Sequence, residues 1–226
     1  GLNASQGEKM DKEGVARAAC RLEIELLKEP IGKQDQYAAA FGGLNVLQFN
    51  PDDSVDVEPV LLDFRRRLNF EDHLLLFFTG ITRSASQILA QQKINMMDKI
   101  DIMTKMADSV LEFRDRLLAG DFHALGAMLH EGWLQKKSLA SVISNPVIDE
   151  LYSEGMKQGS WGGKLLGAGG GGCLLLMVSP EKKNMVRAGL QAVAFKHHLN
   201  DFQEIPFRLV QSGVEILSNS IHMGAM

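Results

Sequence analysis

The chain has 226 residues, enough for one large domain or two modest ones, and its 45% hydrophobic and 23% charged content is ordinary for a globular protein. A formal net charge of −4 argues against a nucleic-acid-binding surface, which normally carries a basic patch. Because the sequence has no apolar run long enough for a membrane span and its first residues are too polar for a signal peptide, we expect a cytoplasmic protein with no membrane partner.

The first part of the chain begins with an expected helix over residues 11–27. Asp11 is placed to cap this helix, and Pro30 follows its end. The apolar side chains at helical spacing are Val15, Ala18, Ala19, Leu22 and Leu26. A turn containing Gly32 leads into a second helix from about Gln34, and residues 44–49 and 55–62 resemble two strands of a hairpin around the turn 50–54.

The second part mixes strands and helices. A continuous apolar run at 74–79 predicts a strand buried on both faces, and helical periodicity follows from Ser84 to about Lys137. Gly120 and Asp121 mark a tight turn between two antiparallel helices in that stretch. The remaining expected elements are a helix at 145–159 that is started by Asn145 and Pro146, a strand at 173–178, a helix at 181–199 and strand material at 206–217. The fold class is therefore expected to be α+β.

The stretch KLLGAGGGGCLLLMV, residues 164–178, places five glycines directly before the strand at 173–178. Glycine permits backbone dihedrals closed to other residues, and such a loop can point successive N–H groups into one concavity that binds phosphate. The alternative is a flexible turn between two elements. Lys164 ahead of the loop and a buried strand directly after it favour a rigid loop over a tether. The spacing fits neither the Walker pattern nor the dinucleotide fingerprint.

These residues resemble the third sequence motif of the GHMP kinases, a superfamily that includes galactokinases, homoserine kinases and mevalonate kinases. In that family a Gly-Ala-Gly-x-Gly-Gly loop lies beside the nucleotide phosphates and the substrate. The resemblance implies that ATP is bound by Gly167, Ala168, Gly169, Gly170 and Gly171.

A second constellation lies at residues 19–43, where Glu23 falls on the first helix and Asp35 follows twelve residues later. Phosphoryl transfer to a sugar hydroxyl needs Mg²⁺ to bridge the phosphates and a carboxylate to orient the hydroxyl and take its proton. Lys33 is close enough in sequence to favour the ionised form of Asp35. The alternative makes Glu23 a surface residue and Asp35 a helix N-cap.

The same segment is similar to the part of galactokinases in which a helix Glu coordinates magnesium and an Asp-Gln pair, after a Pro-x-Gly turn, presents the catalytic Asp to the sugar. Alignment through residues 30–32 implies that Glu23 is the Mg²⁺ ligand and Asp35 the base. Lys33, which lies near Asp35 in the sequence, is expected to be a second catalytic residue. Gln34 and Gln36 can donate hydrogen bonds to a polyol, so both are expected to bind the substrate.

Among these families, the chain most resembles the sugar kinases acting on D-glycero-D-manno-heptose 7-phosphate, which phosphorylate the anomeric oxygen. The resemblance rests on residues 29–43, 74–89, 132–138 and 144–152. It implies ATP and Mg²⁺ as cofactors and a sugar phosphate as substrate, although fucokinase domains share parts of the same sequence pattern. A polar turn suited to the substrate or its existing phosphate is formed by Thr79, Gly80, Thr82, Arg83 and Ser84.

Several of these side chains have plainer alternatives. Arg83 suits a bidentate grip on phosphate, and an exposed loop arginine is an equally good interpretation. Lys136 and Lys137 could attract a second phosphate, although a solvated helix face is the commoner explanation for such a pair. His123 and His130 lack a partner in register and are expected to be structural rather than metal ligands.

The resemblance implies a two-domain GHMP kinase-like fold. Residues 1–66 would be the remainder of an N-terminal domain, and residues 67–226 a C-terminal ferredoxin-like α/β domain with extra helices. The glycine- and serine-rich ATP loop that GHMP kinases carry ahead of this segment is missing from the sequence. We therefore expect either a sugar kinase with a truncated N-terminal domain or a non-catalytic sugar-phosphate-binding module. In a kinase, Asp35 and the glycine loop should face each other across one cleft.

Overall fold

The computed structural model describes residues 10–83, 88–89 and 99–215. The chain divides into two compact units, Gly1–Leu61 with Leu209–Met226 and Leu62–Arg208. The predicted domain boundary after residue 66 stays a prediction. None of the helices in the described ranges combines the length and the apolar character needed to cross a membrane.

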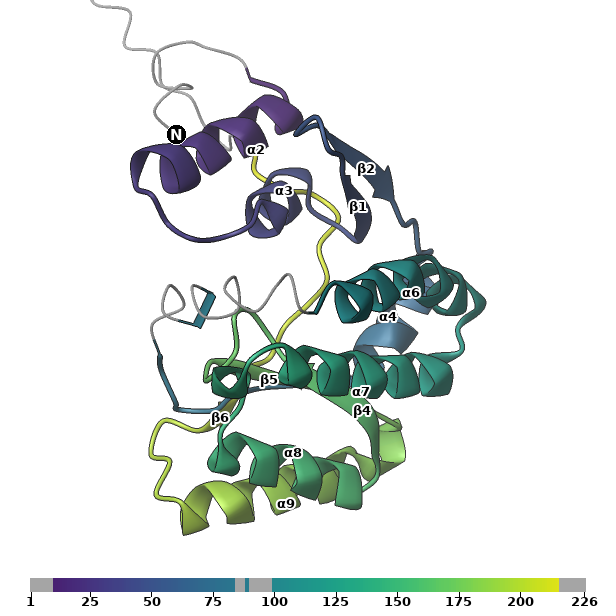
Figure 1. The fold of residues 1–226 in the computed structure, drawn as a ribbon. Helices are drawn as coiled ribbons and strands as arrows, with labels where there is room; N and C mark the ends of the chain where they lie inside the picture. Colours follow the sequence, from purple (N-terminus) through teal and green to yellow (C-terminus); the bar gives the residue numbers. More distant parts are fainter. Residues whose placement is uncertain (1–9, 84–87, 90–98, 216–226) are drawn as a thin grey trace, which may run out of the picture. The chain divides into compact units, whose positions relative to one another are not determined.

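The first unit consists of a helical pair and a β-hairpin (Figure 1). Helix α2, Lys12–Cys20, is capped by Asp11, whose side chain accepts a hydrogen bond from the Gly14 N–H, and it continues into a π-helical turn at Arg21–Leu26. Helix α3 spans Gln34–Phe41, and strands β1, Asn45–Phe49, and β2, Val55–Pro59, pair in antiparallel fashion. The predicted helices and hairpin of this unit are confirmed.

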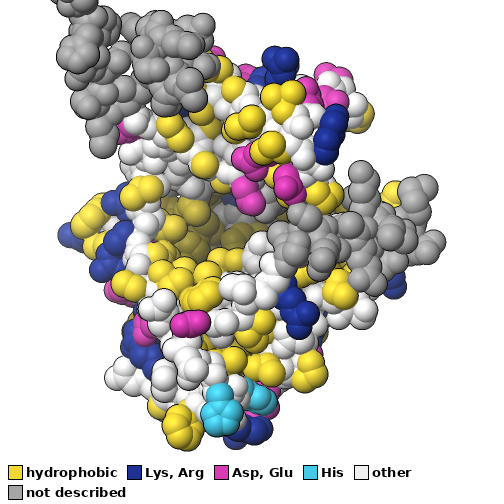
Figure 2. All heavy atoms as spheres, turned by 90° about the vertical axis from the view of Figure 1, so that its left-hand side faces the viewer, with side chains coloured by type: hydrophobic (Ala, Val, Ile, Leu, Met, Phe, Trp, Pro, Cys, Tyr) yellow, Lys and Arg dark blue, Asp and Glu magenta, His cyan; other side chains and the backbone are white. Residues whose placement is uncertain are grey.

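The apolar face predicted for the first helix is not the face that packs. Leu22 is 52% exposed and Leu26 is 64% exposed, whereas Ala16 and Cys20 are buried against Tyr37 and Ala40 of α3. The small side chains of Ala16 and Cys20 let the two helices approach closely, which a periodicity count weighted toward leucine does not detect. Figure 2 shows that other apolar side chains are also exposed, among polar and charged ones.

The second unit is built on a four-stranded antiparallel sheet in the order β4-β5-β3-β6. The strands are β3, Leu74–Phe78, β4, Ser160–Leu165, β5, Cys173–Val178, and β6, Gln203–Glu204. The helices are α4, Phe64–Asp72, α6, Ile100–Ala119, α7, Phe122–Leu139, α8, Pro146–Lys157, and α9, Lys183–Lys196. When the four strands are numbered along the chain, their order across the sheet is second, third, first, fourth, which is the ferredoxin-like arrangement. The expected α+β class is therefore confirmed.

The core of this unit lies between the sheet and its helices. Helices α8 and α9 lie side by side (Figure 1), and their apolar side chains pack with those of β3 and β5. The fully buried members include Leu75, Leu151, Leu174, Leu176 and Leu190. The predicted caps are confirmed, because Asp121 accepts a hydrogen bond from the Ala124 N–H and Asn145 accepts from the N–H groups of Val147 and Ile148.

Helix α4 and strand β4 of the second unit were not predicted. Helix α4 has a mostly polar sequence with three consecutive arginines, and it is held by Asp63, whose carboxylate accepts a hydrogen bond from the Arg66 N–H at 2.9 Å. Strand β4 contains Gly162 and Gly163, and glycine is disfavoured inside strands, so the sequence did not indicate one here. A Cβ on Gly162 would lie 1.9 Å from the Gly126 carbonyl oxygen, so glycine is required here because α7 packs directly on the strand backbone.

The strand predicted at 206–217 is wrong over its described part, since only Gln203–Glu204 pair with β3. The following residues make isolated hydrogen bonds within the first unit, from the Gly43 N–H to the Val210 oxygen and from the Val214 N–H to the Ala39 oxygen. These two hydrogen bonds, to a loop and to a helix, do not form the ladder of a strand. Pro206 also has no N–H with which to extend the pairing of β6. Residues 216–217 lie outside the described part of the chain.

Candidate functional site

The glycine loop joins β4 to β5 and is shaped by left-handed backbone conformations. Gly167, Gly169, Gly170 and Gly172 have φ values of +66°, +108°, +72° and +92°. L-residues with a side chain rarely adopt such values, so the chain follows this path only because these positions are glycine.

The loop is fixed to its surroundings by backbone hydrogen bonds. The Gly170 N–H donates to the Ile143 oxygen at 2.8 Å, and the Gly172 N–H donates to the Ile81 oxygen at 2.8 Å. A Cβ on Gly169 would lie 2.7 Å from the same Ile143 oxygen, and one on Gly171 would lie 2.3 Å from the Ile81 oxygen. The loop is therefore a rigid part of the second unit, as the sequence predicted, and the flexible-tether alternative does not describe it.

Part of the loop backbone is available to an anion. The N–H groups of Gly167, Ala168 and Gly171 donate to no other residue within the described ranges, and of these residues Gly167 is exposed, Ala168 half-buried and Gly171 buried. The N–H of Gly170, in contrast, is already used by Ile143, so Gly170 contributes shape rather than a donor. Neighbouring backbone N–H groups without internal partners are what an anion-binding concavity provides.

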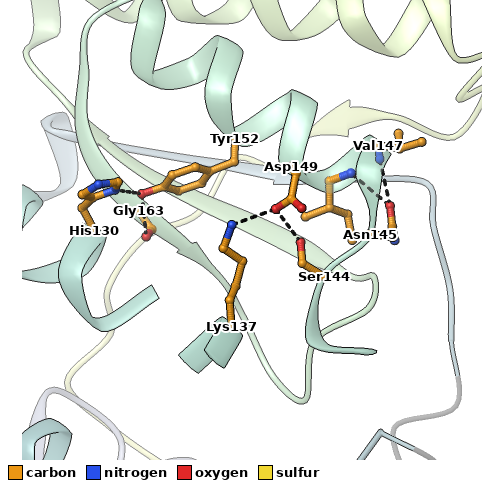
Figure 3. Close-up of polar contacts among 9 residues, drawn as sticks. His130, Lys137, Ser144, Asn145, Val147, Asp149, Tyr152 and Gly163 are labelled. Carbon is orange, nitrogen blue, oxygen red and sulfur yellow. Dashed lines mark hydrogen bonds and ion pairs between the residues drawn. The ribbon is translucent and has the colours of Figure 1, made fainter. Parts of the chain in front are cut away.

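The segment from the end of α7 to the start of α8 supports the loop. The Asn145 amide donates to the Gly170 oxygen at 3.3 Å, and the Lys136 ammonium donates to the Gly167 oxygen. Figure 3 shows that Asp149 accepts hydrogen bonds from Lys137 and Ser144, each at 2.9 Å. The charge of Lys137 is thus compensated within the unit, and its role at a second phosphate stays a prediction.

The polar turn after β3 belongs to the same support. Thr79 is fully buried, and both its N–H and its hydroxyl donate to the Gly172 oxygen, at 2.9 and 2.8 Å. Arg83 is exposed, and its Cγ lies 3.6 Å from the position that a Cβ on Gly170 would take, so its stem passes beside the glycine loop. Gly80 has φ +74° and packs near the Phe202 backbone, and Ser84 lies outside the described residues.

Lys164 was assigned no role from the sequence beyond its place ahead of the glycines. It is half-buried in β4, and burial lowers the pKa of its ammonium. Neither an acidic neighbour nor a hydrogen bond within the described ranges offsets that effect of burial on the pKa. The available signal in the sequence was a lysine between Gly163 and Leu165, with no acidic residue beside it to favour its charged form.

The two predicted carboxylates lie in the first unit. Glu23 is half-buried in the π-helical turn, and its Oε2 accepts a hydrogen bond from the Gln36 amide at 2.8 Å. Asp35 is exposed in the first turn of α3, where Lys33 occupies the N-cap position, so the alternative that Asp35 caps the helix is wrong. The positive end of the helix dipole favours a carboxylate in this first turn.

The neighbours of Asp35 differ from the expectation. The Lys33 ammonium donates to the Asp53 carboxylate at 2.8 Å and to the Asp53 backbone oxygen at 3.3 Å, and the hydrogen bond to the carboxylate raises the pKa of Lys33. Lys33 is therefore engaged by the hairpin turn rather than by Asp35. The Gln34 amide lies 3.4 Å from Asp35 Oδ1, whereas the buried amide of Gln36 is directed toward Glu23.

His130, one of the two histidines expected to be structural, is used in that way. His130 Nδ1 lies 2.7 Å from the Tyr152 hydroxyl, which in turn lies 3.4 Å from the Gly163 oxygen (Figure 3). Burial raises the pKa of Tyr152 far above its ordinary range.

No group of three or more His, Cys, Asp or Glu residues within the described ranges could hold a metal by itself. Mg²⁺ in phosphoryl-transfer sites needs only one or two protein carboxylates because the substrate phosphates complete its shell, and Glu23 fits that requirement.

The two halves of the candidate site lie in different units. The glycine loop belongs to the second unit, and Glu23 and Asp35 belong to the first. That Asp35 faces the loop across one cleft therefore stays a prediction.

Comparison with known proteins gives a consistent family signal. Residues 113–196 match the family model described as GHMP kinases C terminal. The chain is 32% identical to a D-glycero-alpha-D-manno-heptose 7-phosphate kinase of Campylobacter jejuni over 177 residues, which are 77% of this chain and 52% of the relative. It is 29% identical to an L-fucokinase/L-fucose-1-P guanylyltransferase of Bacteroides fragilis, covering 82% of this chain and 20% of that protein.

Solved structures show the same relationship. A D-glycero-D-manno-heptose 1-phosphate kinase from Bacteroides thetaiotaomicron superposes with a TM-score of 0.62 at 26% identity, covering 96% of this chain and 60% of the other. A galactokinase of Lactococcus lactis in complex with galactose gives a TM-score of 0.70 at 16% identity, over 94% and 63% of the two chains. At that identity the galactokinase shows the fold alone. The chain spans about half the length of the heptose 7-phosphate kinase that it matches.

Proposed function

The chain belongs to the GHMP kinases and carries their C-terminal domain, and from this premise we propose that the protein is an ATP-dependent kinase that phosphorylates the anomeric hydroxyl of D-glycero-D-manno-heptose 7-phosphate. The observation that carries the proposal is the pair of carboxylates on adjoining helices. Asp35 is exposed in the first turn of α3, and Glu23 is held beside that helix by Gln36. One carboxylate is free to meet a hydroxyl while the other has a fixed orientation.

In this proposal the two acids have separate tasks. Asp35 accepts the proton of the anomeric hydroxyl and orients the oxygen toward the γ-phosphoryl group. Glu23 would hold the Mg²⁺ of the nucleotide, an ion that supplies charge neutralisation at the phosphates when bound. Gln34, which is exposed next to Asp35 on α3, is assigned to the sugar.

The glycine loop is assigned to the phosphates. The N–H groups of Gly167, Ala168 and Gly171 are donors without a partner in the described residues, and rigid donors lose little freedom when they bind an anion. Arg83, whose stem lies beside Gly170, is assigned to the 7-phosphate of the sugar, because a guanidinium can bind phosphate through two parallel hydrogen bonds.

Two alternatives remain. The similarity to a fucokinase supports a kinase for fucose, a sugar without phosphate, and in that case Arg83→Met should not change the KM for the sugar. The other alternative is a sugar-phosphate-binding module without catalysis. It predicts binding of heptose 7-phosphate with no detectable nucleotide binding in titration calorimetry.

The decisive experiment uses the complete reading frame that contains this chain. Turnover with Mg-ATP should be measured against heptose 7-phosphate, fucose and galactose, and heptose 7-phosphate should give the highest kcat/KM. Asp35→Asn should lower kcat by roughly 10²–10⁴-fold with little change in KM, because the variant keeps the shape but cannot take a proton. Glu25→Gln is the matched control, since Glu25 is an exposed carboxylate in the same π-helical turn as Glu23. Full turnover by Asp35→Asn would exclude Asp35 as the base.

A further inference from the structure

Gln36 was expected to bind the substrate, and its environment indicates a different task. The residue is only 8% exposed and lies next to Tyr37, which is buried in the core between α2 and α3. Its amide nitrogen donates to Glu23 Oε2 at 2.8 Å. A side chain enclosed in this way and directed at Glu23 is poorly placed to meet a sugar hydroxyl.

The amide is retained at this position at an energetic cost. The Oε1 atom of Gln36 is buried, and no residue within the described ranges donates a hydrogen bond to it. A buried acceptor without a donor is unfavourable, and an apolar side chain of similar length would avoid the penalty. Buried polar groups that break a packing rule in this way are concentrated at functional positions, where a specific interaction outweighs the lost stability. The specific interaction of Gln36 is the hydrogen bond to Glu23.

The backbone around Glu23 also directs its carboxylate toward Gln36. The Leu27 N–H donates to the Leu22 oxygen at 3.0 Å, a five-residue spacing that inserts one extra residue into the helix. Glu23 and Ile24 are half-buried, with Ile24 packed on the core shared with α3, whereas Leu27 is 62% exposed. π-helical turns of this type occur frequently at functional sites because they redirect one side chain. Here the redirected carboxylate meets Gln36.

We propose that Gln36 is a positioning residue, which together with the π-helical turn fixes the Glu23 carboxylate in the orientation that binds the divalent cation of the nucleotide. The inference rests on the proposed function. One oxygen of Glu23 accepts from Gln36, and a carboxylate retains lone pairs for a cation while one oxygen is hydrogen-bonded. Partners that orient a metal ligand in this way change metal affinity by about 10–100-fold when they are removed.

The test is metal binding by the complete protein, with Mn²⁺ as the probe. Mn²⁺ binding in the presence of a non-hydrolysable ATP analogue is followed by electron paramagnetic resonance. Gln36→Met keeps the length of the side chain and removes the donor, so it should weaken Mn²⁺ binding by about tenfold or more. The KM for the sugar should not change. Gln48→Leu is the control, because Gln48 is an exposed glutamine of β1 in the same unit.

A double-mutant cycle separates positioning from substrate binding. If Gln36 acts through Glu23, adding Gln36→Met to Glu23→Gln should cause no further loss of Mn²⁺ binding. Independent losses in the cycle, or a raised sugar KM in Gln36→Met, would overturn the inference in favour of a substrate role. Gln36→Asn, which keeps an amide but is one methylene shorter, should show the same metal defect and serves if Gln36→Met does not fold.

Failure of the positioning role and failure of the proposed function give different results. A wild-type protein that binds Mn²⁺ with the nucleotide analogue, together with Gln36 variants that bind it equally well, overturns the positioning role and leaves the kinase proposal intact. A wild-type protein that binds neither nucleotide nor Mn²⁺ overturns the proposed function and this inference with it.

Discussion

Substitution of Gly169 by alanine tests whether the glycine loop is a rigid part of the second unit. A residue with a side chain in a left-handed conformation costs about 1–2 kcal/mol, and the φ of +108° at Gly169 is at least as demanding. The new Cβ would lie 2.7 Å from the Ile143 oxygen, and overpacking of this kind costs about 1–3 kcal/mol. The lower freedom of the unfolded chain offsets about 0.4–1 kcal/mol. Gly169→Ala should therefore destabilise the unit by about 3 kcal/mol.

Urea unfolding followed by tryptophan fluorescence measures this loss, because both tryptophans, Trp133 and Trp161, belong to the second unit. Gly120→Ala is the matched control. Gly120 has φ +77° at the end of α6, but no atom lies within 4 Å of the position that a Cβ would take there, so only the conformational cost of about 1 kcal/mol applies. Equal losses in the two variants would refute the reasoning, because the Ile143 contact would then contribute nothing.

Two further predictions concern pH. Lys164→Met should stabilise the second unit at neutral pH, because burial lowers the pKa of Lys164 and so disfavours its charged form in the folded state. The gain in the free energy of unfolding should shrink as pH rises toward about 10.4, where the lysine of the unfolded chain also loses its proton. Equal gains in urea titrations at pH 7 and pH 10 would contradict this prediction. Arg187→Met should destabilise by about 1 kcal/mol at pH 7, because the guanidinium donates to both oxygens of Glu204, at 2.7 and 2.8 Å, and lowers the pKa of that carboxyl. A carboxyl with a lowered folded pKa contributes stability above its unfolded value of about 4.3 and loses it as pH falls, so the difference should shrink below about pH 4.3 and vanish once Glu204 is protonated in the folded protein. A difference that persists in acid would assign the effect to packing of the arginine stem.

The elements that could be predicted are those whose signals are local. The capping residues Asp11, Asp121 and Asn145 marked helix starts correctly, because a cap is a hydrogen bond to a backbone N–H only two or three residues away. The uninterrupted apolar runs of β3 and β5 marked the central strands, since only a strand inside a covered sheet tolerates such a run. Strand β4 was missed because its glycines are explained only by the approach of α7.

The sequence by itself determined the fold class and the position of the glycine loop, because both depend on neighbours along the chain. The roles of the acids at 23 and 35 rest on the family resemblance and stay predictions. Only the tertiary structure decided which partner each polar side chain of the site has. Lys33 and Asp53 are twenty residues apart, and Gln36 and Glu23 are thirteen apart on different helices. Such contacts depend on the packing of α3 against α2 and on the hairpin that follows, and long-range packing leaves no periodic trace in the sequence.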